Sequence, residues 1–354
     1  MDKYSDLKNE CIAIGSLPHN TLEDAVSFLN RFKYNIPFCP QLSRYSKNED
    51  MLIQFLENMP GVSFDSEKIS IDENSKIFQK NAELLFSDYA KILNSDFSIL
   101  EKYAVSEDFC AYFKYFIKNI SDIKPKYAKT QVTGPFTLSV NIFDSDNNKA
   151  CFNDNIFEII TKTLALKALW QIQEIKKVSS NTIPIIFIDE PTISQIEQFD
   201  NSVDFKKNVL KHIKFISDLI KKNGAISAIH CCGDCNWSDL LMIDFDMINF
   251  DAYTYSNNFS KYAHDIKRFL EKNGKIVWGI VPTLDKKSLI NSDLSELEHK
   301  LYEAKSILNA CDINDELIEN NSLISSSCGC ATLSVELAEK TFKLTKDLSE
   351  KLKG

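Results

Sequence analysis

The chain has 354 residues, 44% of them hydrophobic, and carries a formal net charge of −9 at pH 7. This length can bury a large core in one elaborated domain or in two smaller ones. The acidic balance and the absence of a lysine/arginine cluster disfavour a nucleic-acid or anionic-membrane surface. No apolar run approaches the roughly 20 residues of a membrane span, and the charged start MDKYSDLKNE does not fit a signal peptide. We therefore expect a cytoplasmic protein.

Short apolar segments that end in turn-forming or chemically unusual residues recur along the chain and predict eight strands. Segments with apolar residues at three- and four-residue spacing separate most of them and predict helices. Near-continuous apolar strands that alternate with helices are typical of a parallel sheet covered on both faces. Eight such units favour a closed (β/α)8 TIM barrel, and no GxGxxG follows the first strand, which disfavours an open dinucleotide-binding sheet. The predicted strands are Cys11–Gly15, Ile36–Phe38, Lys129–Thr133, Ile183–Asp189, Ala225–His230, Met247–Asp251, Ile276–Ile280 and Leu323–Ser327. The predicted helices are Thr21–Phe32, Asn155–Val178, Ser202–Asn223, Asn258–Asn273, Leu294–Ala310 and Ser334–Leu352.

A long polar segment rich in phenylalanine, between Arg44 and Tyr127, interrupts this alternation after the second strand. Its apolar spacing predicts at least two helices, near Glu73–Leu93 and Asp96–Ile120. We expect a helical insertion that covers one mouth of the barrel or extends one side of it. No linker rich in proline, glycine or serine and no internal repeat is present. The sequence therefore predicts one domain over residues 1–354, with the insertion at about 44–127.

Chemistry in such barrels takes place at the carboxyl ends of the strands, and polar, thiol and turn residues gather at those ends here. His230 and Cys232 are two positions apart, so their side chains leave a strand on the same face. A closed barrel would bring Cys328, at the end of the eighth strand, within reach of both. Two thiolates and one imidazole favour zinc over magnesium or calcium, and three protein ligands leave a coordination position open for catalysis.

Other interpretations of these residues stay open. His230 could be a buried histidine among inert thiols, and Cys232-x-x-Cys235 could be half of a structural zinc site, although a second C-x-x-C is absent. Asp189-Glu190 could cap a helix, but we interpret the pair as part of a site in which both carboxylates face the barrel mouth. His19 is expected at the surface. The remaining cysteines are expected in the core; they are Cys11, Cys39, Cys110, Cys151 and Cys311.

Five motifs in a fixed order resemble the zinc-binding catalytic barrel of cobalamin-independent methionine synthase, within the uroporphyrinogen-decarboxylase-like superfamily. They are Ile14-Gly15-Ser16, Thr133-Gly134-Pro135, Asp189-Glu190-Pro191, His230-x-Cys232 and Cys328-Gly329. The resemblance runs from Ile14 to about Cys330 and is poor over the insertion. It implies a (β/α)8 barrel in which His230, Cys232 and Cys328 bind zinc.

The resemblance also implies roles by position. Asp251 stands where the synthases have a glutamate ligand to zinc, and its shorter side chain leaves a direct or a water-bridged role open. Ile14, Gly15 and Ser16 match the segment that holds the carboxylate of the amino-acid substrate. Asp189 matches the acid that contacts the substrate's amino group, which makes it both a substrate-binding and a catalytic residue.

The departures from the synthases concern the folate side of the reaction. The synthases have a tryptophan after the TGP motif, where this chain has Asn141, and a histidine after the seventh strand, where it has Val281-Pro282-Thr283. We also expect no counterpart of their amino-terminal second barrel. This pattern resembles short core-type methionine synthases and methylcobamide:thiol methyltransferases. It implies zinc-dependent methyl transfer to homocysteine from a corrinoid, free or on a donor protein. The alternatives are another acceptor thiol, such as coenzyme M, and a metal-free uroporphyrinogen-decarboxylase-like enzyme, which would need arginines near the first strand.

Overall fold

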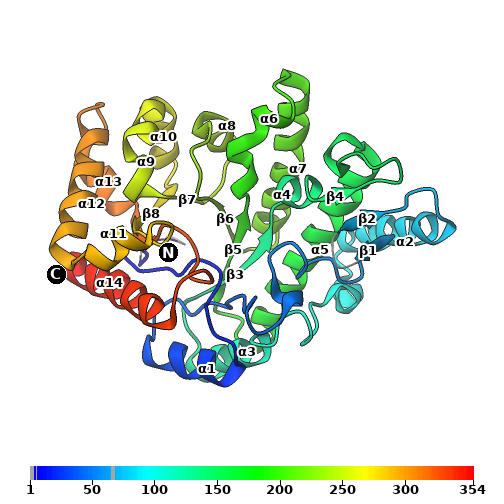
Figure 1. Ribbon diagram of the computed structural model, residues 1–354, viewed down its shortest axis with the longest axis horizontal. Coiled ribbons are helices and arrows are strands. Elements are labelled where there is room, and N and C mark those ends of the chain that lie inside the picture. The colour runs from blue at the N-terminus through cyan, green and yellow to red at the C-terminus, as the bar shows by residue number, and fades with distance from the viewer. Residues whose placement is uncertain (1–3, 5, 65–67) are drawn as a thin grey trace.

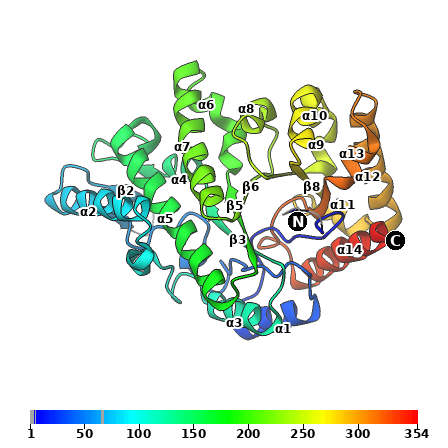
Figure 2. The ribbon, with the colours of Figure 1, turned by 180° about the vertical axis from the view of Figure 1, so that it is seen from behind.

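The computed structural model describes residues 4, 6–64 and 68–354, and its centre is a curled sheet of six parallel strands. The strands are β3 Tyr127–Thr133, β5 Ile183–Asp189, β6 Ile226–Cys231, β7 Met247–Phe250, β8 Lys275–Val281 and β9 Ser322–Ser326. They pair in this order, each parallel to the next. Figures 1 and 2 show helices around the outer side of the curled sheet. The predicted α/β class is confirmed, with six of the predicted strands in place.

The helices follow the strands in alternation and start at residues suited to that position. Asn153 and Ser202 accept hydrogen bonds from backbone N–H groups at the starts of α5 and α7, as N-cap residues do. The α-helices are α1 Leu22–Arg31, α2 Lys76–Leu93, α3 Phe113–Ile123, α4 Pro135–Ser139, α5 Asp154–Val178, α6 Ile196–Phe199, α7 Val203–Lys222, α8 Trp237–Leu241, α9 Ala252–Phe259, α10 Ala263–Glu271, α11 Lys286–Asn291, α12 Leu294–Asn309, α13 Asp315–Asn320 and α14 Val335–Lys353. The 3-10 helices are η1 Lys47–Glu49, η2 Phe97–Tyr103, η3 Ala150–Phe152, η4 Pro191–Gln195 and η5 Ser260–Tyr262. The helix predicted at Asn258–Asn273 is divided among α9, η5 and α10. In the ranges that the structure describes, no helix has the length and apolar character needed to cross a membrane.

The first two predicted strands are not regular strands, which corrects the prediction. Cys11 forms a single parallel bridge with Ile324 of β9, and Phe38 forms one with Lys129 of β3. Pro37 lies within this second segment and Pro40 lies two residues after it, and proline has no N–H to donate to a ladder. Both segments therefore run beside the edge strands of the sheet without continuous pairing.

Two separate apolar clusters cover the two faces of the sheet. The larger one packs strand residues such as Ile186 and Ile188 against the surrounding helices. The smaller one contains alternate strand residues, such as Ile185 and Phe187, and includes no helical residue. Because successive side chains of a strand point to opposite faces, this second cluster lies on the concave face. Its buried members are Leu7, Ile12, Ile14, Ile36, Tyr127, Ile185, Phe187, Ile226, Ala228, Met247, Val277 and Leu323.

The predicted insertion extends one side of the molecule, where α2 and a small sheet lie away from the curled sheet (Figure 1). Strands β1 Val62–Phe64 and β2 Ile69–Ile71 form an antiparallel hairpin, and β4 Ile142–Phe143 pairs with β2. The first predicted helix corresponds to α2. The second is divided into η2 and α3. Residues 65–67 of the predicted insertion lie outside the described residues.

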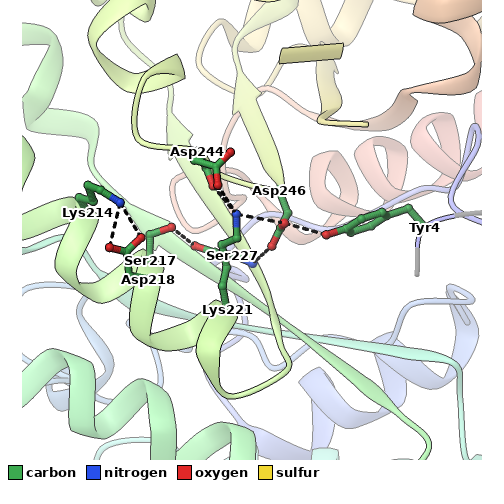
Figure 3. Close-up of polar contacts among 8 residues, drawn as sticks. All are labelled: Tyr4, Lys214, Ser217, Asp218, Lys221, Ser227, Asp244 and Asp246. Atoms are coloured by element: carbon green, nitrogen blue, oxygen red, sulfur yellow. Dashed lines mark hydrogen bonds and ion pairs between the residues drawn. The ribbon is translucent and has the colours of Figure 1, made fainter. Parts of the chain in front are cut away.

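Polar contacts tie the amino-terminal ends of β6 and β7 to α7 (Figure 3). Asp246 accepts hydrogen bonds from Ser227 N (2.8 Å) and Tyr4 Oη (2.7 Å). Ser227 Oγ donates to Ser217 Oγ (2.8 Å), and Lys221 pairs with Asp244 (2.8 Å). In barrels, this end of the strands serves stability, whereas chemistry takes place at the opposite end.

Candidate metal centre

His230, Cys232 and Cys328 meet at the carboxyl ends of β6 and β9. One ligand atom from each lies within 4.8 Å of the other two. His230 is buried, and both cysteines are half-buried. Within the described part of the chain, this is the one group of three or more histidine, cysteine or acidic side chains with such spacing. The curl of the sheet is the cause, because β6 and β9 are separated by β7 and β8. The predicted group is therefore confirmed as a possible metal site.

Hydrogen bonds and charges among these groups favour the thiolate form of Cys232. The Cys328 thiol donates to Cys232, and together with the His230 imidazole it lowers the pKa of the Cys232 thiol against the opposing effect of burial. Burial lowers the pKa of His230, but Cys232, Asp189 and Asn249 outweigh it and raise that pKa to about 9. The same hydrogen bond to Cys232 raises the pKa of Cys328. The donors, one imidazole nitrogen and two sulfurs, fit zinc.

Two glycines allow the close backbone approach on which the site depends. A Cβ atom at Gly233, directly after Cys232, would lie 2.5 Å from Ser194 Oγ. A Cβ atom at Gly329, directly after Cys328, would lie 2.5 Å from Ser16 Oγ. Both distances are too short for any larger residue without movement of its neighbours. The absence of a side chain at each glycine thus lets the backbone after each cysteine pack directly against its neighbour.

The predicted carboxylate-binding segment lies against the Cys328 loop. Cys330 N donates to Ser16 O (2.8 Å), and Ala331 N donates to Ser16 Oγ (3.3 Å). Gly15 has φ +45°, a left-handed conformation that favours glycine, and Ile14 belongs to the apolar cluster on the concave face. The structure thus brings Ser16 next to the loop that carries Cys328.

Asp189 ends β5 beside His230, its register partner on β6. Its side chain is buried, and within the described residues Oδ1 has no hydrogen-bond partner. Burial raises the pKa of Asp189, while Lys129 and His230 act to lower it. Lys129 is completely buried on β3 and donates to Gln131 Oε1 (2.7 Å). Our sequence reasoning did not single out Lys129, although a lysine within a predicted buried strand is a detectable signal.

Glu190 does not face the barrel mouth, which corrects our interpretation of the Asp-Glu pair. Its carboxylate is buried and accepts hydrogen bonds from Phe136 N (2.8 Å), Thr137 N (2.8 Å) and Thr137 Oγ1 (2.6 Å). Burial raises the pKa of Glu190 to about 7 against these hydrogen bonds. Glu190 therefore anchors the start of α4 and leaves Asp189 as the acid of the pair that lies beside the His-Cys-Cys group.

Asp251 lies outside the group of three metal-capable side chains. It is the N-cap residue of α9, and its Oδ1 accepts from Thr254 N (3.0 Å). Burial raises the pKa of Asp251, and both Cys232 and His230 are close enough to affect its charge. A role for Asp251 at the metal stays a prediction.

Asn249 was missed by sequence reasoning. It is completely buried on β7, and its Oδ1 lies 2.5 Å from His230 Nδ1. The signal in the sequence was a single amide within an apolar strand.

Two other expectations need correction. His19 is buried rather than at the surface, and its ring centroid lies 4.8 Å from that of Phe28. Cys311 is exposed rather than in the core, whereas Cys11, Cys39, Cys110 and Cys151 are buried as expected.

No protein family model matches the chain. No curated protein matches it significantly either. The function is therefore inferred from the residues of the site.

Proposed function

We propose that this chain is a zinc-dependent methyltransferase that moves a methyl group to a thiol, homocysteine, with a corrinoid as the methyl donor. One observation carries the proposal: a His-Cys-Cys group lies at the carboxyl end of a parallel sheet, directly beside a buried acid that has an unpartnered oxygen. The order of the motifs and their resemblance to the catalytic barrel of cobalamin-independent methionine synthase support it.

Zinc bound by His230, Cys232 and Cys328 would hold the sulfur of an incoming thiol as a thiolate, a better nucleophile than the protonated thiol. Asp189 would bind the acceptor's ammonium group through its unpartnered oxygen, and Ser16, next to the Cys328 loop, would bind the carboxylate. These two contacts would fix the acceptor sulfur beside the metal ligands. An acceptor without an amino group, such as coenzyme M, would leave the Asp189 oxygen unused, so homocysteine is favoured.

We further propose that the sheet belongs to a complete (β/α)8 barrel, in which the segments near Cys11 and Phe38 take the places of the missing strands. The single bridges from these segments to β9 and β3 support this closure. The cluster on the concave face supports it too, because Ile12 and Ile36 from the same segments pack there with residues from every strand of the sheet.

The proposed methyl donor is inferred from the two positions at which the synthases have residues that act on the folate. Thr283 stands where the synthases have a histidine, and its hydroxyl donates to Cys328 O (3.1 Å). Asn141 stands in the stretch of the folate-stacking tryptophan and donates to Thr137 O (2.7 Å). Neither residue supplies an acid or a stacking surface. A cobalamin leaving group needs no proton, whereas methyl-folate leaves as a poor anion and needs a general acid.

A uroporphyrinogen-decarboxylase-like activity is less well supported. It would need free arginines for the carboxylates of a tetrapyrrole. Arg31 is paired with Glu339, and Arg44 donates to Leu333 O (2.8 Å). Both arginines near the first strand are thus already engaged within the chain.

The test is methyl transfer to homocysteine from methylcobalamin and from methyl-tetrahydrofolate, measured side by side with zinc-loaded protein. We expect methionine from the cobalamin donor only. Cys232→Ser should abolish the product, whereas Cys151→Ser, a buried cysteine outside the site, should retain it. Product from the folate alone would overturn the corrinoid assignment, and no product from either donor with zinc bound would overturn the proposed activity.

A further inference from the structure

A chain of hydrogen bonds runs behind His230 across four adjacent strands, β6 to β9. His230 Nδ1 contacts Asn249 Oδ1 (2.5 Å). Asn249 Nδ2 donates both to Val277 O (2.8 Å) and to Ser325 Oγ (2.8 Å). Ser325 Oγ in turn donates to Ser326 O (2.9 Å). Asn249, Val277 and Ser325 are completely buried, so water does not compete for these groups.

The direction of each hydrogen bond in this chain is determined by backbone carbonyls, which can only accept. Val277 O takes one Asn249 Nδ2 proton. Ser326 O takes the Ser325 hydroxyl proton, so Ser325 Oγ must accept the second Nδ2 proton. Both amide protons are then committed. Asn249 Oδ1 is left as an acceptor only, and His230 Nδ1 must carry the proton. Rotation of the Asn249 amide by 180° would place its oxygen against Val277 O. The two oxygens would repel each other, because neither carries a proton to donate.

We propose that Asn249 is a positioning residue of the metal centre, which holds a proton on His230 Nδ1 and thereby presents Nε2 to the two cysteines. The inference rests on the metal site of the proposed function. A ligating histidine needs its second nitrogen oriented by a partner, and a buried amide fixed at both of its donor hydrogens supplies a rigid one.

The same chain of contacts continues to the second ligand strand. Ser326, whose carbonyl accepts from Ser325, donates its own hydroxyl to Cys328 O (2.8 Å). One connected set of buried groups therefore positions His230 and Cys328, although these residues follow strands that are not neighbours in the sheet. The site is organised by the protein before any metal binds.

The test uses the full chain labelled with ¹⁵N-histidine, which gives few ring signals because the sequence has 5 histidines. We expect the His230 signal, assigned by its loss in His230→Gln, to show a proton on Nδ1 with and without metal. In protein loaded with ¹¹³Cd, coupling to the metal should be on Nε2. Asn249→Leu should weaken zinc binding about 10–100-fold in a chelator competition.

Asn321→Leu is the matched control, because Asn321 is a buried amide at the opposite end of the sheet and accepts from Lys275 Nζ (2.6 Å). It should leave zinc affinity unchanged. Coupling of ¹¹³Cd to Nδ1, or unaltered zinc affinity in Asn249→Leu, overturns the inference. The nitrogen assignment does not use Asn249→Leu, so it decides the matter even where that variant does not fold. An unaltered chain that binds no zinc or cadmium contradicts the proposed function, and the Nδ1 proton can still be tested in that metal-free protein.

Discussion

The sulfur atoms of Cys232 and Cys328 lie within 4.8 Å of each other, although the two residues follow β6 and β9, strands that β7 and β8 separate in the sheet. Such a contact requires the sheet to be curled. A metal held by this pair and His230 would therefore bridge the two ends of a four-strand arc, and its affinity would depend on the curl of the sheet.

Cys328→Ser should remove most of the metal from a protein that otherwise holds about one zinc per chain, because a neutral hydroxyl is a poor replacement for a thiolate ligand. The circular dichroism spectrum should be unchanged. The matched control is Cys330→Ser, since Cys330 is buried two positions away and lies outside the group. Metal content by atomic absorption decides: full zinc in Cys328→Ser would mean that the third ligand is a different residue.

Asp251→Ala should weaken zinc affinity about 10–100-fold if the carboxylate orients a metal-bound water. This change also removes the N-cap of α9, which costs about 1 kcal/mol of stability. Asp251→Asn separates the two effects, because asparagine is an equally good N-cap but carries no charge. Chelator competition should show weak binding in both variants, while thermal unfolding should show a loss in Asp251→Ala alone. Zinc affinity that is normal in Asp251→Asn would limit this residue to the capping role.

The parts of the fold that followed from the sequence are those with strong local signals. β5 was predictable because five of its seven residues are isoleucine or phenylalanine, and a short, nearly continuous apolar run is typical of a buried strand. The segments near Cys11 and Phe38 have similar composition. Two prolines limit the pairing of the segment near Phe38, and the pairing of both segments depends on the curl of the sheet. Composition alone does not reveal such single-bridge contacts.

The residues of the site also differ in whether their arrangement could be predicted from local sequence. His230 and Cys232 could be paired from their spacing, since alternate residues share a face of a strand. The direction of the Glu190 side chain could not be predicted, because it depends on the position of Phe136 N and Thr137 N at the start of α4. Asn249 belongs to the same class: its role is set by carbonyls on β8 and β9 that only the folded sheet brings near.

Asp189→Asn should raise the KM for homocysteine about 10–100-fold, which corresponds to the loss of roughly 1.5–3 kcal/mol from a charge-assisted hydrogen bond to the ammonium group. Zinc content should not change. The comparison substrate is 2-mercaptoethanesulfonate, which has no amino group. Its KM should be the same for the unaltered chain and for Asp189→Asn. An equal loss with both thiols would indicate that Asp189 acts on the metal centre rather than on the acceptor.

His212, on α7, offers a pH-dependent prediction that is independent of the metal. It is buried, its ring is stacked on Phe157 with 3.9 Å between centroids, and its Nδ1 lies 2.9 Å from Thr161 Oγ1. The Thr161 hydroxyl donates to Phe157 O (2.8 Å), so the histidine nitrogen is the donor in this contact. Burial lowers the pKa of His212 from about 6.5 to about 4.

Because that pKa is lower in the folded chain, the unfolded chain takes up a proton first as the pH falls. The stability due to neutral His212 is therefore fully present above pH 6.5 and is lost as the pH falls towards 4. The difference between the pKa of His212 in the folded chain and in the unfolded chain changes the free energy of unfolding by about 3 kcal/mol. His212→Phe keeps a ring against Phe157 and should lose about that much less stability than the unaltered chain between pH 7 and pH 4. Urea unfolding at both pH values measures it, with His264→Gln, at an exposed histidine, as the control. Equal losses in His212→Phe and the unaltered chain would contradict the prediction, because the acid sensitivity would then arise from other groups.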